Sequence, residues 1–274
     1  MTTKAKSTKK SAKDKVVLET TAAAPLTGPI HIAPIATETI RVRVQGMAGS
    51  PYCCHAFTKK AILEMEAKHN GETATRKKEP KDQWNDFIEA GHWTYDAKGK
   101  ITSLCAPALQ FKKATVDAVR HVGDRKTLTM AATRSWFYIK GTDPKNPNMV
   151  PLTAEPLPKN LWTDMDYRFA GEEEGKKSQW VNDKRITEME RLHQMGVSIR
   201  RDAVTVGMGK DLRYRPIIHN WTAEFDLEYH PNQVTLEGLM NLINTGGSLN
   251  GIGEWRPSSP KACGDWGRFT VEAI

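Results

Sequence analysis

Arginine, tryptophan and glycine gather near the end of the chain, where they could contact phosphates and bases. Arg256 follows Trp255 directly, and Arg268 lies shortly after Trp266. A guanidinium group grips phosphate through a planar fork, and an indole ring stacks on a base. Glycine lets backbone N–H groups approach a phosphate closely, and the candidate glycines are Gly246, Gly247, Gly251 and Gly253. We predict a nucleic-acid-binding loop in which both guanidinium groups face the ligand.

The same stretch also fits a structural role, as a glycine-rich hairpin that closes a sheet with its tryptophans in the core. Two nucleotide-binding motifs are excluded. A Rossmann fingerprint needs its glycines between a strand and a following helix, whereas here they precede the last predicted strand. A P-loop needs Gly-Lys followed by Ser or Thr, which the sequence lacks.

Two further pairs of arginines are candidate nucleic-acid contacts. Arg213 and Arg215 flank a tyrosine ahead of the clearest predicted strand. Arg41 and Arg43 alternate with apolar residues in a strand predicted over 39–46. Their side chains would lie on the exposed face of a sheet, where RRM sheets carry RNA. Ordinary solvation of a surface explains the alternation equally well.

The order of the last elements resembles that of a known family. A predicted helix is followed by Gly251-x-Gly253-x-x-Arg256, a polar loop, Gly264-x-x-Gly267-Arg268 and a last strand. This resembles the glycine-rich loop of the RAMP superfamily, the RRM-like proteins of CRISPR systems. In that family the loop joins the last helix to the last strand of a ferredoxin-like domain and contacts RNA. The whole chain also resembles proteins encoded by tailed phages.

Alternation and helical spacing predict the elements that would position these residues. They are a strand over 39–46, a helix capped by Thr58, a helix opened by Pro107, strands over 135–140, 149–153 and 223–229, a helix capped by Thr235, and a last strand. Gly246 is expected to end the last helix. The order strand, helix, strand, strand, helix, strand predicts an α+β, ferredoxin-like (RRM-like) core.

Two regions are set apart by composition. Residues 1–35 are rich in Lys, Thr, Ser, Ala and Pro, so we expect a disordered, basic, flexible arm. Residues 36–274 are expected to form a single domain with inserted segments near 68–104 and 161–210, where polar stretches interrupt the pattern. The formal net charge is +8, and lysines of the arm supply much of it. The charge of the domain therefore gives only modest support to a nucleic-acid partner.

No cofactor and no metal site are expected. Cys53 and Cys54 are adjacent, no Cys-x-x-Cys occurs, and the histidines show no ligand spacing. The sequence also lacks an apolar signal region and any apolar run of membrane-spanning length. We therefore expect a cytoplasmic protein with reduced thiols and no membrane association, located in the host cytoplasm if the gene belongs to a phage.

His55 with Lys59 and Lys60 raises the question of catalysis. Imidazole titrates near neutrality and lysine stabilises a developing phosphorane, as a metal-independent ribonuclease requires. A lone histidine before a helix is more often structural. No cluster of His, Tyr, Lys or Ser is visible that would supply both an acid and a base.

The sequence therefore favours a non-catalytic protein that binds RNA or single-stranded DNA, assembled as a homo-oligomer or filament along the strand. One alternative is a metal-independent endoribonuclease of the CRISPR-RNA processing type. Another is an inhibitor or scaffold protein that touches no nucleic acid. The choice between RNA and DNA, and any sequence specificity, stay open.

Overall fold

The structure is a computed structural model that describes residues 34–71, 82–123, 128–172, 181–206, 209–260 and 264–274. Residues Ile35–Ile274 form one compact unit, separate from Met1–Pro34. This unit is α+β with antiparallel sheets, as the sequence predicted. The expected basic arm falls outside the described residues except for its last two positions. No helix in the described part of the chain combines the length and apolarity needed to cross a membrane.

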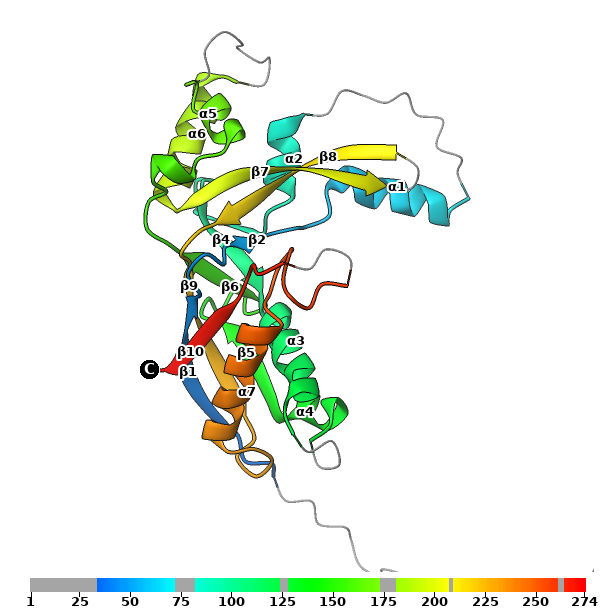
Figure 1. Ribbon diagram of the computed structural model, residues 1–274, viewed down its shortest axis with the longest axis vertical. Coiled ribbons are helices and arrows are strands. Elements are labelled where there is room, and N and C mark those ends of the chain that lie inside the picture. Colours follow the sequence, from blue (N-terminus) through cyan, green and yellow to red (C-terminus); the bar gives the residue numbers. More distant parts are fainter. Residues whose placement is uncertain (1–33, 72–81, 124–127, 173–180, 207–208, 261–263) are drawn as a thin grey trace, which may run out of the picture. The chain divides into compact units, whose positions relative to one another are not determined.

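The larger sheet has seven strands, all paired antiparallel (Figure 1). Six follow the order β10 (Phe269–Ala273), β1 (Glu38–Gly46), β9 (Thr222–Tyr229), β6 (Met149–Thr153), β4 (Ile101–Pro107) and β3 (Trp93–Tyr95). The seventh, β5 (Phe137–Gly141), pairs with the second half of β9, next to the part that pairs with β6. The strands predicted over 39–46, 149–153 and 223–229 are confirmed.

Four of these strands and two helices position the glycine-rich loop. In chain order the elements are β1, α3 (Ala108–Ala118), β5, β9, α7 (Leu236–Leu249) and β10. Across the sheet the four strands lie in the order β10, β1, β9, β5. Helices α3 and α7 pack against each other and on one face of the sheet (Figure 1). The loop is the connection from α7 to β10.

An aromatic cluster joins these helices to the sheet. The ring centroid of Phe111 in α3 lies 6.5 Å from that of Trp221, 5.5 Å from that of Phe225 and 5.4 Å from that of Phe269. All four side chains are fully buried. Tilted and edge-on ring pairs of this kind add about 0.5–1.5 kcal/mol each to the gain from burial. The cluster therefore fixes α3 over β9 and β10.

Two predicted boundaries are wrong. Helix α7 does not end at Gly246 but continues to Leu249, because this glycine serves close packing and not a cap. A Cβ at position 246 would lie 2.6 Å from the carbonyl oxygen of Ala114 in α3. A helix that the sequence did not predict, α4 (Met130–Trp136), also occupies the start of the strand expected over 135–140.

A second, three-stranded sheet has the order β2 (Tyr52–Cys53), β8 (Gly209–Ile218) and β7 (Val197–Val206). Strands β7 and β8 form a long antiparallel pair. The sequence had indicated only loops and one short helix over most of 161–210. Charged residues interrupt the apolar alternation of both strands, so the pattern typical of a half-buried strand is lost.

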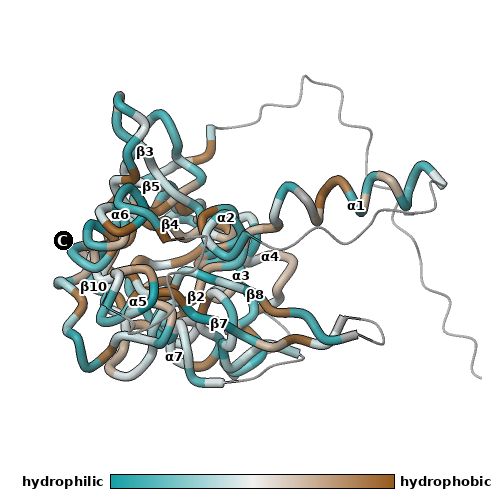
Figure 2. Tube along the Cα trace, turned by 90° about the horizontal axis from the view of Figure 1, so that it is seen from above, coloured by the Kyte–Doolittle hydropathy of each residue, from teal (hydrophilic) through white to brown (hydrophobic). Residues whose placement is uncertain are grey.

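The remaining helices are α1 (Lys59–His69), α2 (Gln83–Glu89), α5 (Asp164–Phe169), α6 (Asp183–Gln194) and the short 3₁₀ helices η1 (Val119–His121) and η2 (Lys159–Leu161). The side chain of Thr58 caps α1 by accepting a hydrogen bond from the N–H of Ala61, as predicted. Helix α1 extends beyond its neighbours with apolar residues along it (Figure 2). Its Leu63 side chain is 54% exposed.

A buried carboxylate connects α5, α6 and β7. Asp166 Oδ2 accepts from the backbone N–H and the hydroxyl of Thr163 and from the Ser198 hydroxyl, while Oδ1 accepts from the Ile199 N–H. The ring Nε2 of His193 lies 3.2 Å from Oδ1. Asp166 itself is fully buried. Because a buried carboxylate is tolerated only when it is well satisfied, this arrangement fixes the two helices against β7.

Candidate functional site

The glycine-rich loop connects α7 to β10 and contacts β2. Several of its backbone N–H groups already have acceptors in the protein. Those of Glu254 and Gly267 donate to carbonyl groups in or next to β2, and that of Gly253 donates to the side chain of Gln110 in α3. A satisfied donor gains little by turning to a phosphate. The phosphate-cradling role expected of the loop backbone therefore does not extend to these three groups.

The predicted glycines divide into two pairs. Gly246 and Gly247 lie buried inside α7, and a Cβ at position 247 would meet the carbonyl oxygen of Phe269 at 2.3 Å. Gly251 and Gly253 have positive φ angles of 65° and 73° and line a cavity beside α3. Only this second pair is placed where a ligand could touch it.

Both arginines of the loop donate hydrogen bonds to backbone oxygens nearby. Arg256 Nη1 donates to the Gly253 carbonyl at 2.7 Å, and Arg268 Nε donates to the Ser248 carbonyl at 2.8 Å. Each side chain is half-buried. The two guanidinium groups therefore brace the loop, although Arg256 also faces a cavity. The expectation that both would face only the ligand does not describe this geometry.

The two loop tryptophans stack with an arginine from the second sheet. The ring centroids of Trp255 and Trp266 are 6.2 Å apart, and the guanidinium carbon of Arg200 in β7 lies 4.5 Å from the Trp266 ring and 5.5 Å from the Trp255 ring. Trp255 has a positive φ of 58°, a conformation that is unfavourable for a bulky residue. The cation–π contact offsets that cost and ties the loop to β7. The sequence did not single out Arg200.

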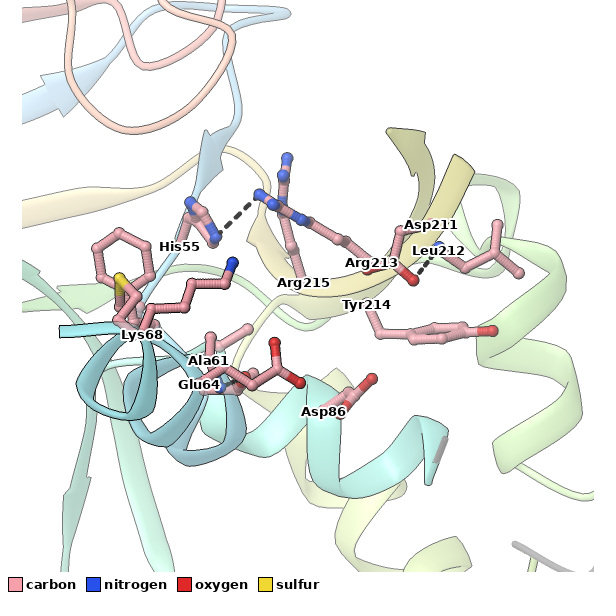
Figure 3. A pocket seen from close by; sticks show the side chains of 15 residues that line it. His55, Ala61, Glu64, Lys68, Asp86, Asp211, Leu212, Arg213, Tyr214 and Arg215 are labelled. Carbon is pink, nitrogen blue, oxygen red and sulfur yellow. Dashed lines mark hydrogen bonds between the residues drawn. The ribbon is translucent and has the colours of Figure 1, made fainter. Parts of the chain in front are cut away.

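Both predicted arginines in β8 line a cavity, but only Arg215 is buried. Arg215 is only 4% exposed, and its Nη1 lies 3.4 Å from Asp202 Oδ2 and 4.0 Å from Glu254 Oε2. A buried guanidinium paired in this way neutralises buried carboxylates in the interior of the protein. Arg213 is half-buried and lies beside His55, with 3.4 Å between its Nη1 and the ring Nε2 (Figure 3).

His55 lies between a carboxylate and an arginine. Its Nδ1 is 3.2 Å from Glu254 Oε1, so Nδ1–H donates to Glu254 while Nε2 accepts from Arg213. A carboxylate that holds one ring nitrogen fixes the tautomer and orients the other nitrogen. This hydrogen bond, together with the charge of Arg215, holds the pKa of Glu254 below its usual range.

The described hydrogen-bond partners of His55 are Glu254 and Arg213, neither of which the sequence analysis grouped with it. Lys59 begins α1 with an exposed side chain, and its backbone N–H donates to Glu89. The side chain of Lys60 lies outside the described atoms. Glu254, which the sequence analysis overlooked, is 199 positions away from His55 along the chain. Only the fold could reveal this pair.

Two adjoining cavities share His55. The first, of about 330 Å³, lies between α1, α2 and β8 and presents Lys68 and Arg213 together with the carboxylates of Glu64, Asp86 and Asp211 (Figure 3). The second, of about 210 Å³, lies between α3 and the loop and presents Arg256, Glu254 and Lys113, which pairs with Asp117 at 3.4 Å. Cationic side chains from α1, α3, β8 and the loop therefore converge on one region.

Arg41 and Arg43 lie apart from this region, on the face of the large sheet opposite to the buried face. Each stands directly across from a carboxylate of β9: Arg41 pairs with Asp226, and Arg43 pairs with Glu224 and, through its other nitrogen, with Glu272. Opposite charges in register stabilise neighbouring strands. The structure therefore assigns these two arginines to ion pairs across β1 and its neighbours, and does not bring them to the loop.

Neither the known family models nor the curated proteins give a match to this chain. Within the described residues, no group of three or more histidine, cysteine or acidic side chains is arranged to hold a metal ion.

Proposed function

We propose that the chain binds single-stranded nucleic acid, RNA or DNA, where the glycine-rich loop meets β8. The observation that carries the proposal is the convergence of Lys68, Lys113, Arg213 and Arg256 on two cavities that share His55. Lysine and arginine side chains from separate elements can follow successive phosphates of a flexible strand. Binding, without chemistry, is the function that this arrangement supports best.

We further propose that β1, α3, β5, β9, α7 and β10 are a ferredoxin-like core of the RRM-like kind. The antiparallel strand order β10, β1, β9, β5 supports this, because the split βαβ pattern places its fourth, first, third and second strands in that order. The resemblance of residues 246–271 to the RAMP glycine-rich loop then implies a ligand at the end of α7. Assembly along the strand and a cytoplasmic location belong to the same proposal.

The ligand is not expected on the open face of the larger sheet. There the arginines are balanced by Glu224, Asp226 and Glu272, and Lys140 of β5 pairs with Glu228 at 2.6 Å. A phosphate on that face would meet paired charges and acidic neighbours. At the cavities near His55, Lys113 pairs with Asp117, but Arg213 has His55, and no carboxylate among the described residues, as its side-chain hydrogen-bond partner. The cavities are therefore the better site.

Fluorescence anisotropy with labelled oligo(U) and oligo(dT) tests the binding site. The double variant Arg213→Gln with Lys113→Gln should weaken binding of at least one probe by about two decades, since a charge-assisted contact contributes about 1.5–3 kcal/mol. It should also reduce the slope of log affinity against log salt by about 1.4, at about 0.7 per phosphate contact. Arg41→Gln with Arg43→Gln is the matched control, because it removes the same net charge from the ion-paired face.

The proposal is wrong if the cavity variant and the control bind alike. Failure of both probes to bind the parent protein would instead favour the inhibitor or scaffold hypothesis. Circular dichroism melts of each variant separate a loss of contacts from a loss of fold.

The His55–Glu254 pair favours one second candidate function, metal-independent cleavage of RNA. If Arg213 moves to a phosphate, the freed Nε2 of His55 can accept the proton of a ribose 2′-hydroxyl. The 2′-oxygen then bonds to phosphorus, the bond from phosphorus to the 5′-oxygen breaks, and water protonates the leaving 5′-oxygen. The product ends in a 2′,3′-cyclic phosphate. Arg213 would stabilise the phosphorane.

The same probes distinguish cleavage from binding. Incubation in EDTA should convert oligo(U) to fragments with cyclic phosphate ends and leave oligo(dT) intact, because DNA has no 2′-hydroxyl. His55→Gln should abolish the products while it retains binding. Cleavage that requires a divalent cation, or that survives this substitution, contradicts the assignment.

A further inference from the structure

A groove outside the His55 region is lined by cations and an exposed aromatic ring. It has a volume of about 790 Å³ and lies between α2, the turn that joins β3 to β4, and α6. These elements lie near one another in Figure 2 as well. Helix α2 separates the groove from the first cavity near His55: Trp84 and Ile88 face the groove, whereas Asp86 and Ala90 face the cavity.

The charge of the groove is positive because its lysines are not balanced. Arg185 pairs with Asp82 and Arg191 pairs with Glu188, so those four charges cancel. Three exposed lysines remain, and no described carboxylate forms an ion pair with any of them: Lys98, Lys100 and Lys184. Two of them lie on the turn and one on α6, on opposite walls of the groove.

The turn also carries a carboxylate, that of Asp96, which interacts electrostatically with Lys100 and Arg191. Asp96 accepts hydrogen bonds at 2.8 Å from the backbone N–H groups of Lys98 and Lys100, so it shapes the turn. It is not among the lining residues. The two lysine side chains therefore extend over the groove from a turn whose backbone is fixed.

The groove also offers a flat apolar surface and amide groups. The Tyr95 side chain is 54% exposed, next to the partly buried Ile88. Asn85 and Asn182 contribute amides that can both donate and accept hydrogen bonds. An exposed ring flanked by cations is the arrangement on which bases stack while phosphates lie at the walls. An acidic peptide would use the lysines but not the ring and the amides together.

We propose that this groove is a second binding site for single-stranded nucleic acid, in which a base stacks on Tyr95 and phosphates lie against Lys98, Lys100 and Lys184. The inference rests on the proposed function for the class of ligand, but its residues are separate from those of the His55 region. Substitutions can therefore abolish binding at one site while the residues of the other site stay unchanged.

The experiment compares two sets of variants with the oligo(U) and oligo(dT) probes. Lys98→Gln, Lys100→Gln and Lys184→Gln together should weaken binding at least tenfold and lower the salt slope by about 2, at about 0.7 per contact. The control removes the same net charge from three exposed lysines on other parts of the chain, of which the first and third are ion-paired: Lys140→Gln, Lys145→Gln and Lys159→Gln. It should bind within about twofold of the parent.

Photo-cross-linking with oligo(dT) that carries 5-iodouracil gives a direct readout. The cross-linked peptide should contain Tyr95, and Tyr95→Ala should remove the product without unfolding the protein. Equal loss of affinity in the groove variant and its control, or cross-links that never map to β3, overturn the inference. If the groove variant loses affinity while Arg213→Gln with Lys113→Gln does not, the groove inference stands and the site proposed near His55 falls. If instead Arg213→Gln with Lys113→Gln loses affinity and the groove variant does not, only the groove inference is wrong. If the parent protein binds neither probe, both proposals are wrong.

Discussion

Replacement of Asp166 by Asn should destabilise the protein strongly, although it changes a single oxygen to an NH₂ group. One carboxylate oxygen accepts from the Thr163 backbone N–H and the other from the Ile199 backbone N–H. An amide has only one acceptor oxygen, so either orientation of Asn would point its NH₂ group at a backbone donor. A hydroxyl or an imidazole can reverse its role, but a backbone N–H cannot.

The expected cost follows from the groups left without partners. One buried backbone N–H loses its acceptor, which costs about 1–3 kcal/mol, and further bonds to a charged acceptor become weaker. A total of about 2–4 kcal/mol corresponds to a fall in Tm of about 4–16 °C for a chain of this size. Differential scanning calorimetry and urea unfolding measure both quantities.

Asp164→Asn is the control on the same helix. Its side chain is 57% exposed and pairs with Arg201, and an exposed ion pair contributes at most about 1 kcal/mol. If Asp166→Asn melted within a degree of the parent, or no lower than Asp164→Asn, the buried carboxylate would not be holding α5 and α6 against β7.

Two further predictions concern the glycine-rich loop, and a third concerns pH. Arg256→Gln with Arg268→Gln should lower the free energy of unfolding by about 1 kcal/mol for each residue, as measured by urea titration, because Arg256 donates to a carbonyl of the loop and Arg268 to a carbonyl in the last turn of α7. Gly267→Ala should prevent the loop from closing and lower the yield of folded protein in expression trials, because φ is 64° and the new Cβ would lie 1.8 Å from a carbonyl oxygen. The pKa of Glu254 is lowered in the folded state by its bond from His55, so its contribution to stability is present above the unfolded pKa of about 4.3 and is lost as pH falls through the folded value. The excess stability of the parent over Glu254→Gln, followed by urea unfolding, should therefore disappear in acid and be constant at neutral pH.

The elements of the larger sheet could be predicted because their residues alternate. In β9 every second side chain from Ala223 to Tyr229 is buried, and β1 buries Val42 and Val44 while its arginines face outward. Period-two patterns of this kind follow directly from the geometry of a strand. The start of α7 could also be predicted from the local sequence, because Thr235 caps the helix by accepting a hydrogen bond from the N–H of Gly238.

The second sheet could not be predicted because its charges are paired in the interior. Asp202 and Arg215 are both buried and form an ion pair diagonally between β7 and β8, since Asp202 stands opposite Arg213 in the register. Charged residues therefore occupy buried positions that the pattern of a strand assigns to apolar residues. The partner that makes such a charge tolerable is not visible in the sequence of either strand. The same reason hid Glu254, whose role depends on His55 in a distant part of the chain.

The loop arginines illustrate a different limit. Composition drew attention to Trp255, Arg256, Trp266 and Arg268, but the direction of each arginine side chain depends on acceptors that only the fold supplies. Sequence patterns predict which face of an element is buried. They do not predict which carbonyl an arginine in a loop will meet.

Because Arg200 of β7 stacks on Trp255 and Trp266, contacts with both sheets hold the loop in place. Trp255 keeps its left-handed backbone next to a partner that belongs to β7. A fragment that kept only the larger sheet with α3 and α7 would lack that partner, and its loop would be free to take other conformations. Substitutions at positions 200 and 255 should for the same reason be non-additive. The conformation of the loop therefore depends on the long β7–β8 pair.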